Sequence, residues 1–396
     1  AEHRADFAHQ RAKVAHYAGD QAAALHYIRL ADIEVPFSSP NVVLHARVLA
    51  ALDREDDARR LLSEAIGYRP KALPLLFALA RLVETPAQLE DFYQLWLRTR
   101  GGDAAFAATV RPLVTASVRV RDFERARAVL RHATAIVLDS RGAITPAVRD
   151  RTLGQDGGRA LVDVVRTLKA HGVPHFLAAG TALGAVRNGA LLSFDTDIDI
   201  GIFEENFDKD RLVEMFSADP NFRIQDIDPI NPKVGLQHWN GVMLDLFIYF
   251  RRDGKVWHSG TYTEWWNTPF DLKTVQLYGQ PMSVPDPAEL YLEECYADWR
   301  TPRPDFDAFF EGPNAKVVWP AYFEAYLHRK AFELVSVGRL DLAAKYVARF
   351  PETLGWLDLA AYGYEPEAAE APDTDSAHAS DEESEADTDL EADEDE

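Results

Sequence analysis

Three aspartates at alternating positions are the residues of this sequence best suited to chemistry. Asp195, Asp197 and Asp199 lie in the stretch SFDTDIDIGIF. Residues i, i+2 and i+4 of a β-strand point to one face, so a strand over 195–203 places the three carboxylates together and turns Thr196 to the other face. Like charges this close repel one another unless a cation lies between them. The spacing therefore predicts a divalent cation, and oxygen ligands indicate Mg²⁺ or Mn²⁺ rather than zinc. The alternative is a solvated acidic face.

The segment before these acids, FLAAGTALGAVRNG, predicts a short buried strand, a Gly180-Thr181 turn and a short helix. The free N–H groups at such a turn suit a phosphate group. Arg187 is the nearby cation for such a group, with a structural ion pair as its alternative. Turn and acids together indicate metal-dependent phosphoryl or nucleotidyl transfer by in-line displacement.

A further acid, Asp245, lies in the otherwise apolar run VMLDLFIYF. A buried unpaired charge is costly, so we expect Asp245 to be the third metal ligand or the base that takes the proton of an acceptor hydroxyl. Asp195 is either a further acid of the site or a residue that only caps or orients its strand.

The elements that position these residues form an α/β block. A helix is predicted from Gly154 to Gly172, further strands at 221–227 and 241–250, and a helix at 206–216 between two of the strands. We assign residues 155–303 to this catalytic domain and residues 304–362 to a helical appendage that turns at Gly338. Residues 365–396 are expected to be a disordered acidic tail.

The first 140 residues contain four similar segments, which recur about every 34 residues and begin at Gly19, Arg54, Pro86 and Val120. Each resembles the second helix of a tetratricopeptide-type hairpin. A TPR-like helical domain over 1–145 would offer a curved surface, where a protein partner could bind. A plain helical domain that packs against the rest is an equal alternative.

Composition limits the remaining possibilities. A chain of 396 residues with 47% hydrophobic residues is globular and long enough for several domains. Residues 365–396 hold 16 acids and no Lys or Arg, which leaves −6 of the net charge of −22 for the remainder. Without a run of basic residues, nucleic acid is not an expected partner. The single cysteine fits a reducing compartment, and we expect a cytoplasmic protein without a membrane span.

A family resemblance appears at the same residues. GTALGAVRNG…SFDTDIDIGI closely resembles the motif G-T-L-L-G-x-x-R-x-G…(W/F)-D-D-D-I-D-I-G of the LicD and fukutin-related phosphotransferases, a branch of the nucleotidyltransferase superfamily. LDLFIY, from Leu244, is similar to the strand that carries the family's third acid, and the segment from Thr268 to Pro302 is similar to its closing segment. The resemblance spans about 155–303. It implies an α+β fold: a nucleotidyltransferase-type mixed sheet with flanking helices, here preceded by the all-α TPR-like region.

The resemblance also implies roles for individual residues. Asp197, Asp199 and Asp245 match the metal ligands and, with Arg187, the catalytic set. The positions that bind the donor match Gly180, Thr181, Gly184 and Arg187. Two positions depart from the family pattern: Thr196 replaces the middle acid, and Ala297 replaces Gly before Asp298. Since Thr196 is expected on the opposite strand face from the metal, its change should leave activity intact.

The family's activity is the transfer of a phospho-substituent, such as phosphocholine or an alditol phosphate, from a CDP-activated donor to a glycan hydroxyl. The resemblance thus implies Mg²⁺ (or Mn²⁺), a CDP-activated donor, a glycan acceptor and a place in cell-surface glycan modification, such as lipopolysaccharide or capsule biosynthesis. Two alternatives stay open: transfer of the nucleoside monophosphate itself, and a catalytically dead binding protein.

Two further sets of residues have open roles. An aromatic cluster could hold a quaternary ammonium group by cation–π contact, or it could be core; it consists of Tyr262, Trp265, Trp266 and Phe270. His238 and His258 could contact phosphate or assist proton transfer, or they could be ordinary buried histidines.

Overall fold

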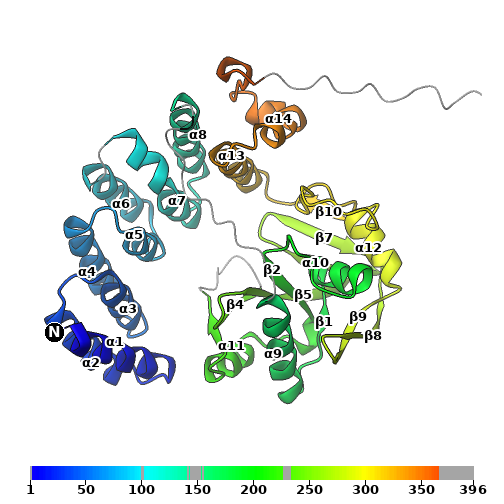
Figure 1. Ribbon diagram of the computed structural model, residues 1–396, viewed down its shortest axis with the longest axis horizontal. Helices are drawn as coiled ribbons and strands as arrows, with labels where there is room; N and C mark the ends of the chain where they lie inside the picture. Colours follow the sequence, from blue (N-terminus) through cyan, green and yellow to red (C-terminus); the bar gives the residue numbers. More distant parts are fainter. Residues whose placement is uncertain are drawn as a thin grey trace, which may run out of the picture. The chain divides into compact units, whose positions relative to one another are not determined.

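The computed structural model describes residues 2–99, 102–140, 142, 153, 156–225 and 233–364. Helices come first in the chain, a mixed sheet with flanking helices follows, and helices return after it (Figure 1). The predicted α+β class is confirmed. Most of the predicted boundary segment between 145 and 155, and the whole predicted tail 365–396, lie outside the described residues. Residues 1–357 form one compact unit and 358–396 a second, and the proposed domain boundaries stay predictions.

The N-terminal region is a series of helices arranged mainly as antiparallel pairs. Helix α1 packs against α2, α3 against α4, and α7 against α8, while α1, α3, α5 and α7 are neighbours in that order. The four repeated segments each fall on a second helix, as predicted, and Asp20 and Asp122 cap two of these by accepting from the Ala23 and Arg125 N–H groups. The bounds are α1 Glu2–Tyr17, α2 Gln21–Glu34, α3 Ser39–Ala50, α4 Glu55–Tyr68, α5 Leu73–Ala80, α6 Pro86–Thr99, α7 Asp103–Arg119 and α8 Phe123–Asp139.

The second region is built on an eight-stranded sheet. Its main order is β1 (Phe176–Leu177), β2 (Asp197–Phe203), β5 (Met243–Arg252), β6 (Lys255–Ser259), β7 (Thr263–Asn267) and β10 (Ala315–Val317). Strand β4 (Val234–His238) also pairs with β5, and β3 (Phe222–Ile224) pairs with β4. Strands β2 and β5 are parallel, whereas the other pairs are antiparallel. Strands β8 (Asp271–Leu277) and β9 (Gln280–Asp286) form a separate hairpin.

The alternation of side chains along β2 divides the sheet into two faces. Ile198, Ile200 and Ile202 are fully buried in a core that includes residues of helix α9 (Asp156–Ala170). Helices α9 and α11 (Lys209–Ala218) cover this face (Figure 1). The intervening acids of β2 are therefore directed to the opposite face.

The predicted elements of this region are present with shorter bounds. Strand β2 begins at Asp197, so Asp195 and Thr196 belong to the loop before it, and β1 contains only two residues. The predicted strand at 221–227 is β3 with Phe222–Ile224, and residues 226 and 227 lie outside the described residues. The remaining short elements of the region are α10 (Ala179–Leu183), the π-helix η1 (Gly184–Asn188), the 3₁₀-helix η2 (Glu204–Asn206) and α12 (Ala288–Tyr296).

Helices return after β10. Helix α13 (Pro320–Ser336) and α14 (Leu340–Arg349) form the predicted hairpin around Gly338, whose φ of +74° suits a residue without Cβ. Short helices α15 (Pro351–Leu354) and η3 (Ala360–Tyr362) follow. Helix α13 packs against α8, where Arg127 pairs with Glu324 and Arg131 Nε lies 2.9 Å from His328 Nε2. Among the described residues, none of the helices is both long and apolar enough to cross a membrane.

Candidate active site

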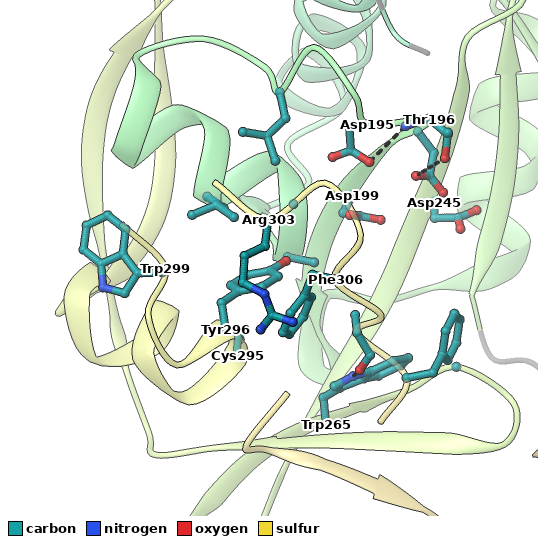
Figure 2. Close-up of a pocket in the computed structure, with 18 of the residues that line it drawn as sticks. Asp195, Thr196, Asp199, Asp245, Trp265, Cys295, Tyr296, Trp299, Arg303 and Phe306 are labelled. Atoms are coloured by element: carbon teal, nitrogen blue, oxygen red, sulfur yellow. Dashed lines mark hydrogen bonds between the residues drawn. The ribbon is translucent and has the colours of Figure 1, made fainter. Parts of the chain in front are cut away.

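A cavity of about 580 Å³ opens where β2 and β5 meet helix α10 and the segment after α12. Its lining falls into two halves (Figure 2). Acidic residues from β2, β5 and the preceding loop occupy one side. Aromatic side chains occupy the other side, among them Trp265, Tyr296, Trp299 and Phe306. A charged end and an apolar end in one cavity suit a ligand with a phosphate group and a ring.

Three acids of the cavity form a close group. Strands β2 and β5 pair in parallel with Asp199 opposite Asp245, and Asp197 lies two residues before Asp199 on the same face. One carboxylate oxygen from each of Asp197, Asp199 and Asp245 lies within 4.8 Å of the others. The structure thus brings together the three acids that the sequence predicted as metal ligands, one of them from a strand more than 40 residues away in the sequence.

The environment of these acids disfavours their charged forms. Burial, together with the Asp245 carboxylate, raises the pKa of Asp197 to about 6. Burial and the carboxylates of Asp197, Asp195 and Asp245 raise the pKa of Asp199 well above its usual value. The negative charge of these acids is therefore not fully balanced by nearby positive charge.

The ammonium group of Lys233 is the cation that meets these acids, and sequence reasoning missed it. Lys233 forms an ion pair with Asp245 and lines the cavity. Lys233 precedes β4, which pairs antiparallel with β5. No motif marks this lysine, because its place beside the acids depends on that strand pairing.

The arrangement of Asp197, Asp199 and Asp245 fits the binding of a divalent cation. Oxygen ligands converge from two strands, and their mutual repulsion with burial holds the pKa values of Asp197 and Asp199 high. Among the described residues, Lys233 is the cation whose charge lowers the pKa values of Asp197 and Asp199, and it does not offset the effects that raise them. A hard cation such as Mg²⁺ prefers such oxygen ligands and would relieve the repulsion.

Asp195 and Gly180 are matched to each other. A Cβ added at Gly180 would overlap Asp195 Oδ2, so only glycine leaves room for this carboxylate above the turn. Asp195 Oδ1 accepts from the Thr196 N–H at 2.9 Å. Burial and the Asp197 carboxylate raise the pKa of Asp195 to about 7. Asp195 thus both orders the loop before β2 and contributes a carboxyl group to the cavity.

The expectation that Thr196 faces away from the site is wrong. Because β2 begins one residue later, the strand alternation does not extend to Thr196. Its side chain is exposed, lines the cavity and lies with Oγ1 3.3 Å from Asp197 Oδ1. The departure from the family motif at this position therefore lies within the site.

The remaining residues of the predicted turn occupy different places. Thr181 is fully buried, and its Oγ1 accepts from the Asp199 N–H at 2.8 Å, which fixes β2 against α10. A Cβ at Gly184 would lie 2.6 Å from the Ala190 carbonyl oxygen, so this glycine permits close backbone packing. Gly180 lines the cavity, whereas Thr181 and Gly184 are not among the described residues that do. Donor-phosphate binding by these three stays a prediction.

Arg187 lines the cavity. Its Nη1 donates to the Trp299 carbonyl at 2.9 Å and its Nε to Asn188 Oδ1 at 2.8 Å. Within the described ranges it makes no ion pair, so the structural pairing with an acid that the sequence left open is not found. Its catalytic role stays a prediction.

The aromatic cluster and the histidines separate into cavity and core residues. Tyr262 and Trp265 line the cavity, whereas Trp266 stacks on Trp257 and Phe270 packs in the core. His238 is buried with Nε2 3.2 Å from Asp163 Oδ2, away from the cavity.

His258 belongs to the cavity. Its ring stacks between Tyr249 and Trp265, and its buried Nδ1 has no hydrogen-bond partner. Burial lowers the pKa of His258 to about 3, so its ring is neutral near pH 7.

Part of the chain, including this site, is similar to known proteins. The family model for the LicD/FKTN/FKRP nucleotidyltransferase domain matches residues 172–286. The chain is 25% identical over 169 residues to ribitol-5-phosphate transferase FKTN of Mus musculus, a match that covers 39% of this chain and 36% of that relative. The human protein of the same name is 24% identical over the same shares. The match thus spans about a third of the length of these curated relatives.

Proposed function

We propose that the chain is a metal-dependent phosphotransferase, because residues 172–286 match the family model for the LicD/FKTN/FKRP nucleotidyltransferase domain. It moves a phospho-substituent from a CDP-activated donor to a glycan hydroxyl. The observation that carries this proposal is the group formed by Asp197, Asp199 and Asp245, whose oxygens lie within 4.8 Å of one another at the end of a cavity. The relatives' printed activity, ribitol-5-phosphate transfer, supports the class of reaction.

The residues of the cavity have distinct roles in this proposal. Asp197, Asp199 and Asp245 hold Mg²⁺, which when bound offsets the negative charge of the donor's phosphate groups. Lys233 forms an ion pair with Asp245 and adds a second positive charge at the same end of the cavity. Arg187, already oriented by Trp299 and Asn188, extends its guanidinium into the cavity wall as a donor for phosphate oxygens.

Proton transfer needs a carboxyl group outside the three ligands. Asp195 fits this role better than Asp245, because Asp245 is paired with Lys233 whereas the pKa of Asp195 is raised to about 7. A group with a pKa near the working pH takes the proton of an acceptor hydroxyl efficiently.

The aromatic end of the cavity suits the apolar part of the donor. Trp265 and Tyr262 present ring surface there, and His258 offers an unpartnered nitrogen. Phosphocholine would place its quaternary ammonium on these rings by cation–π contact, whereas an alditol phosphate would hydrogen-bond to His258. The finer elements of the proposal are the choice between these donors, a role in lipopolysaccharide or capsule biosynthesis, a cytoplasmic location and a protein partner on the helical repeats.

The reaction is tested by the product that leaves the donor. The full chain is incubated with CDP-choline, CDP-glycerol or CDP-ribitol and a mixture of glycans, with Mg²⁺ or with EDTA. We expect Mg²⁺-dependent release of CMP with one donor. Release of pyrophosphate from a nucleoside triphosphate instead would establish the alternative, transfer of the nucleoside monophosphate. No product from any donor, with the chain folded, would support the dead binding protein.

A further inference from the structure

The first helices of the N-terminal pairs share a face that carries arginines. Residues of α1, α3, α5 and α7, together with the turn after α5 and Arg223–Gln225 at β3, line a second cavity of the protein. The four helices are neighbours in that order (Figure 1). The arginines of the cavity are Arg47, Arg81, Arg111, Arg119 and Arg223, of which Arg47 and Arg81 already have partners, and we call this cavity the arginine groove.

The described lining of the groove is basic, although the protein is acidic. The chain has a net charge of −22, yet none of the described residues that line this cavity is Asp or Glu. Part of the arginine set is held in place: Arg119 Nε donates to the Val83 carbonyl at 3.2 Å, which leaves its terminal nitrogens for another acceptor. Guanidinium groups bind the oxygens of phosphate through paired, directional hydrogen bonds.

The uncharged residues of the groove add ring surface between the cations. Tyr17 and Phe77 lie among small residues of α3 and α5, Ala46, Ala50 and Ala78. Alternating ring faces and cations suit a polymer in which sugar or alditol units alternate with anionic groups. A uniformly charged peptide would make less use of the apolar positions.

We propose that the arginine groove binds a glycan that already carries phosphodiester groups, and so holds the growing acceptor. This inference rests on the proposed function, because each transfer of a phospho-substituent to a glycan hydroxyl adds a phosphodiester with one negative charge. The product of one transfer therefore has the charge that the groove recognises. Most of the groove lies on helices outside residues 172–286, although its edge at Arg223–Gln225 lies within them. None of its described lining residues also lines the cavity that holds the acids, so the two sites are distinct.

The test is calorimetric titration of the full chain with poly(glycerol phosphate) of about ten units, in EDTA and without donor. We expect binding that weakens as salt rises, as for other polyanions. The change Arg111→Gln should weaken binding about tenfold, because it removes a charge-assisted hydrogen bond. The matched control is Arg29→Gln on the exposed surface of α2, which makes the same charge change outside the groove and should leave binding unchanged.

Two further measurements separate this proposal from the proposed function. Asp199→Asn should abolish CMP release yet bind poly(glycerol phosphate) as the unchanged chain does. Arg111→Gln should release CMP normally with a short uncharged acceptor. Failure of CMP release in the unchanged chain would overturn the proposed function while leaving groove binding measurable.

Three results would overturn the groove proposal. The first is no binding of poly(glycerol phosphate) at low salt. The second is an equal loss of affinity in Arg29→Gln, which would mean that binding follows net charge alone. The third is equal or tighter binding of poly-glutamate of the same length, which would make the groove a site for acidic peptides.

Discussion

The acids of the cavity are held by packing that leaves little freedom for their neighbours. The N–H of Asp199 donates to the buried Thr181 hydroxyl, which holds Asp199 in place. The missing Cβ at Gly180 leaves room for the carboxylate of Asp195. Lys233 offsets only part of the charge that results. The carboxylates of the site are thus held in place while they still repel one another. Both properties favour the binding of a cation.

Replacing Asp199 by Asn should separate function from stability. We expect Asp199→Asn to abolish CMP release, because it removes a ligand charge, and to raise the melting temperature in EDTA at pH 8, because it removes like-charge repulsion. A gain of ~1 kcal/mol would raise it by about 2–4 °C. Thermal denaturation and a CMP assay measure the two effects. Asp210→Asn, an exposed acid on α11, is the control and should change neither. Full turnover of Asp199→Asn at saturating Mg²⁺ would refute the ligand assignment.

Replacing Gly180 by Ala tests the match with Asp195. The added Cβ would overlap Asp195 Oδ2, which is the free end of a side chain, so the carboxylate should move aside at little cost in stability. We expect kcat/KM to fall at least about tenfold. Gly67→Ala is the control: nothing lies within 4 Å of its Cβ, and it lies in helix α4, where alanine is favourable. Equal activity of the two variants would mean that Asp195 does not need its observed position.

At the scale of elements, the parallel pair β2 and β5 makes stability depend on pH. In the folded chain Asp197 and Asp195 keep their protons up to pH values of about 6 and 7, whereas an unfolded aspartate loses its proton near pH 3.9. The folded state thus binds more protons between these values. The contribution of these two carboxyl groups to stability should be greatest near pH 4 and should be lost as the pH rises through about 7. Buried His258, whose pKa is about 3, contributes in the opposite direction up to about pH 6.5.

This dependence predicts a metal effect of definite sign. In EDTA we expect Asp197→Asn to raise the melting temperature above that of the unchanged chain more at pH 7.5 than at pH 5, because Asp197 is charged only at the higher pH. Mg²⁺ should raise the melting temperature of the unchanged chain more at pH 7.5, where its binding does not have to displace protons. Differential scanning calorimetry at the two pH values measures both effects. An equal effect of Asp197→Asn at pH 5 and pH 7.5 would contradict the prediction.

The same elements explain what the sequence could predict. The alternating acids and isoleucines of β2 and the amphipathic pattern of α9 are local signals, so the strand, the helix and the grouping of the three acids were predictable from the residues. Their role as metal ligands stays a prediction. Thr196 was misplaced because the strand begins later than its alternating pattern suggests. Lys233 was missed because its position depends on the pairing of β4 with β5, a non-local contact that no pattern within 233–238 reveals.

At the scale of the whole molecule, the acidic segment 365–396 tests which parts the chemistry needs. It holds 16 acids and no Lys or Arg, and its composition offers almost no apolar anchor. We expect a chain that ends at Gly363 to keep its kcat/KM within about tenfold, equivalent to ~1.4 kcal/mol. Steady-state CMP release with one donor measures this. A larger loss would mean that the segment contributes to the site.

The helical region and the α/β domain should separate chemistry from acceptor binding, because all four acids, Lys233 and Arg187 lie between residues 180 and 245. A fragment of residues 145–360 retains these groups and α13, whose Lys330 also lines the cavity, so it should bind the CDP donor with Mg²⁺ as the full chain does. It loses α8, however, and exposes the surface where Tyr322 stacks on Phe123 at 5.1 Å, so it should be less soluble.

A fragment of residues 120–360 keeps α8, so it should be more soluble and should have the same donor affinity. Both fragments should transfer poorly to a phosphodiester-bearing polymer. Calorimetry measures donor affinity and product mass measures transfer. If both fragments were soluble and folded but did not bind the donor, helices α1–α7 would form part of the nucleotide site, because both fragments lack those helices.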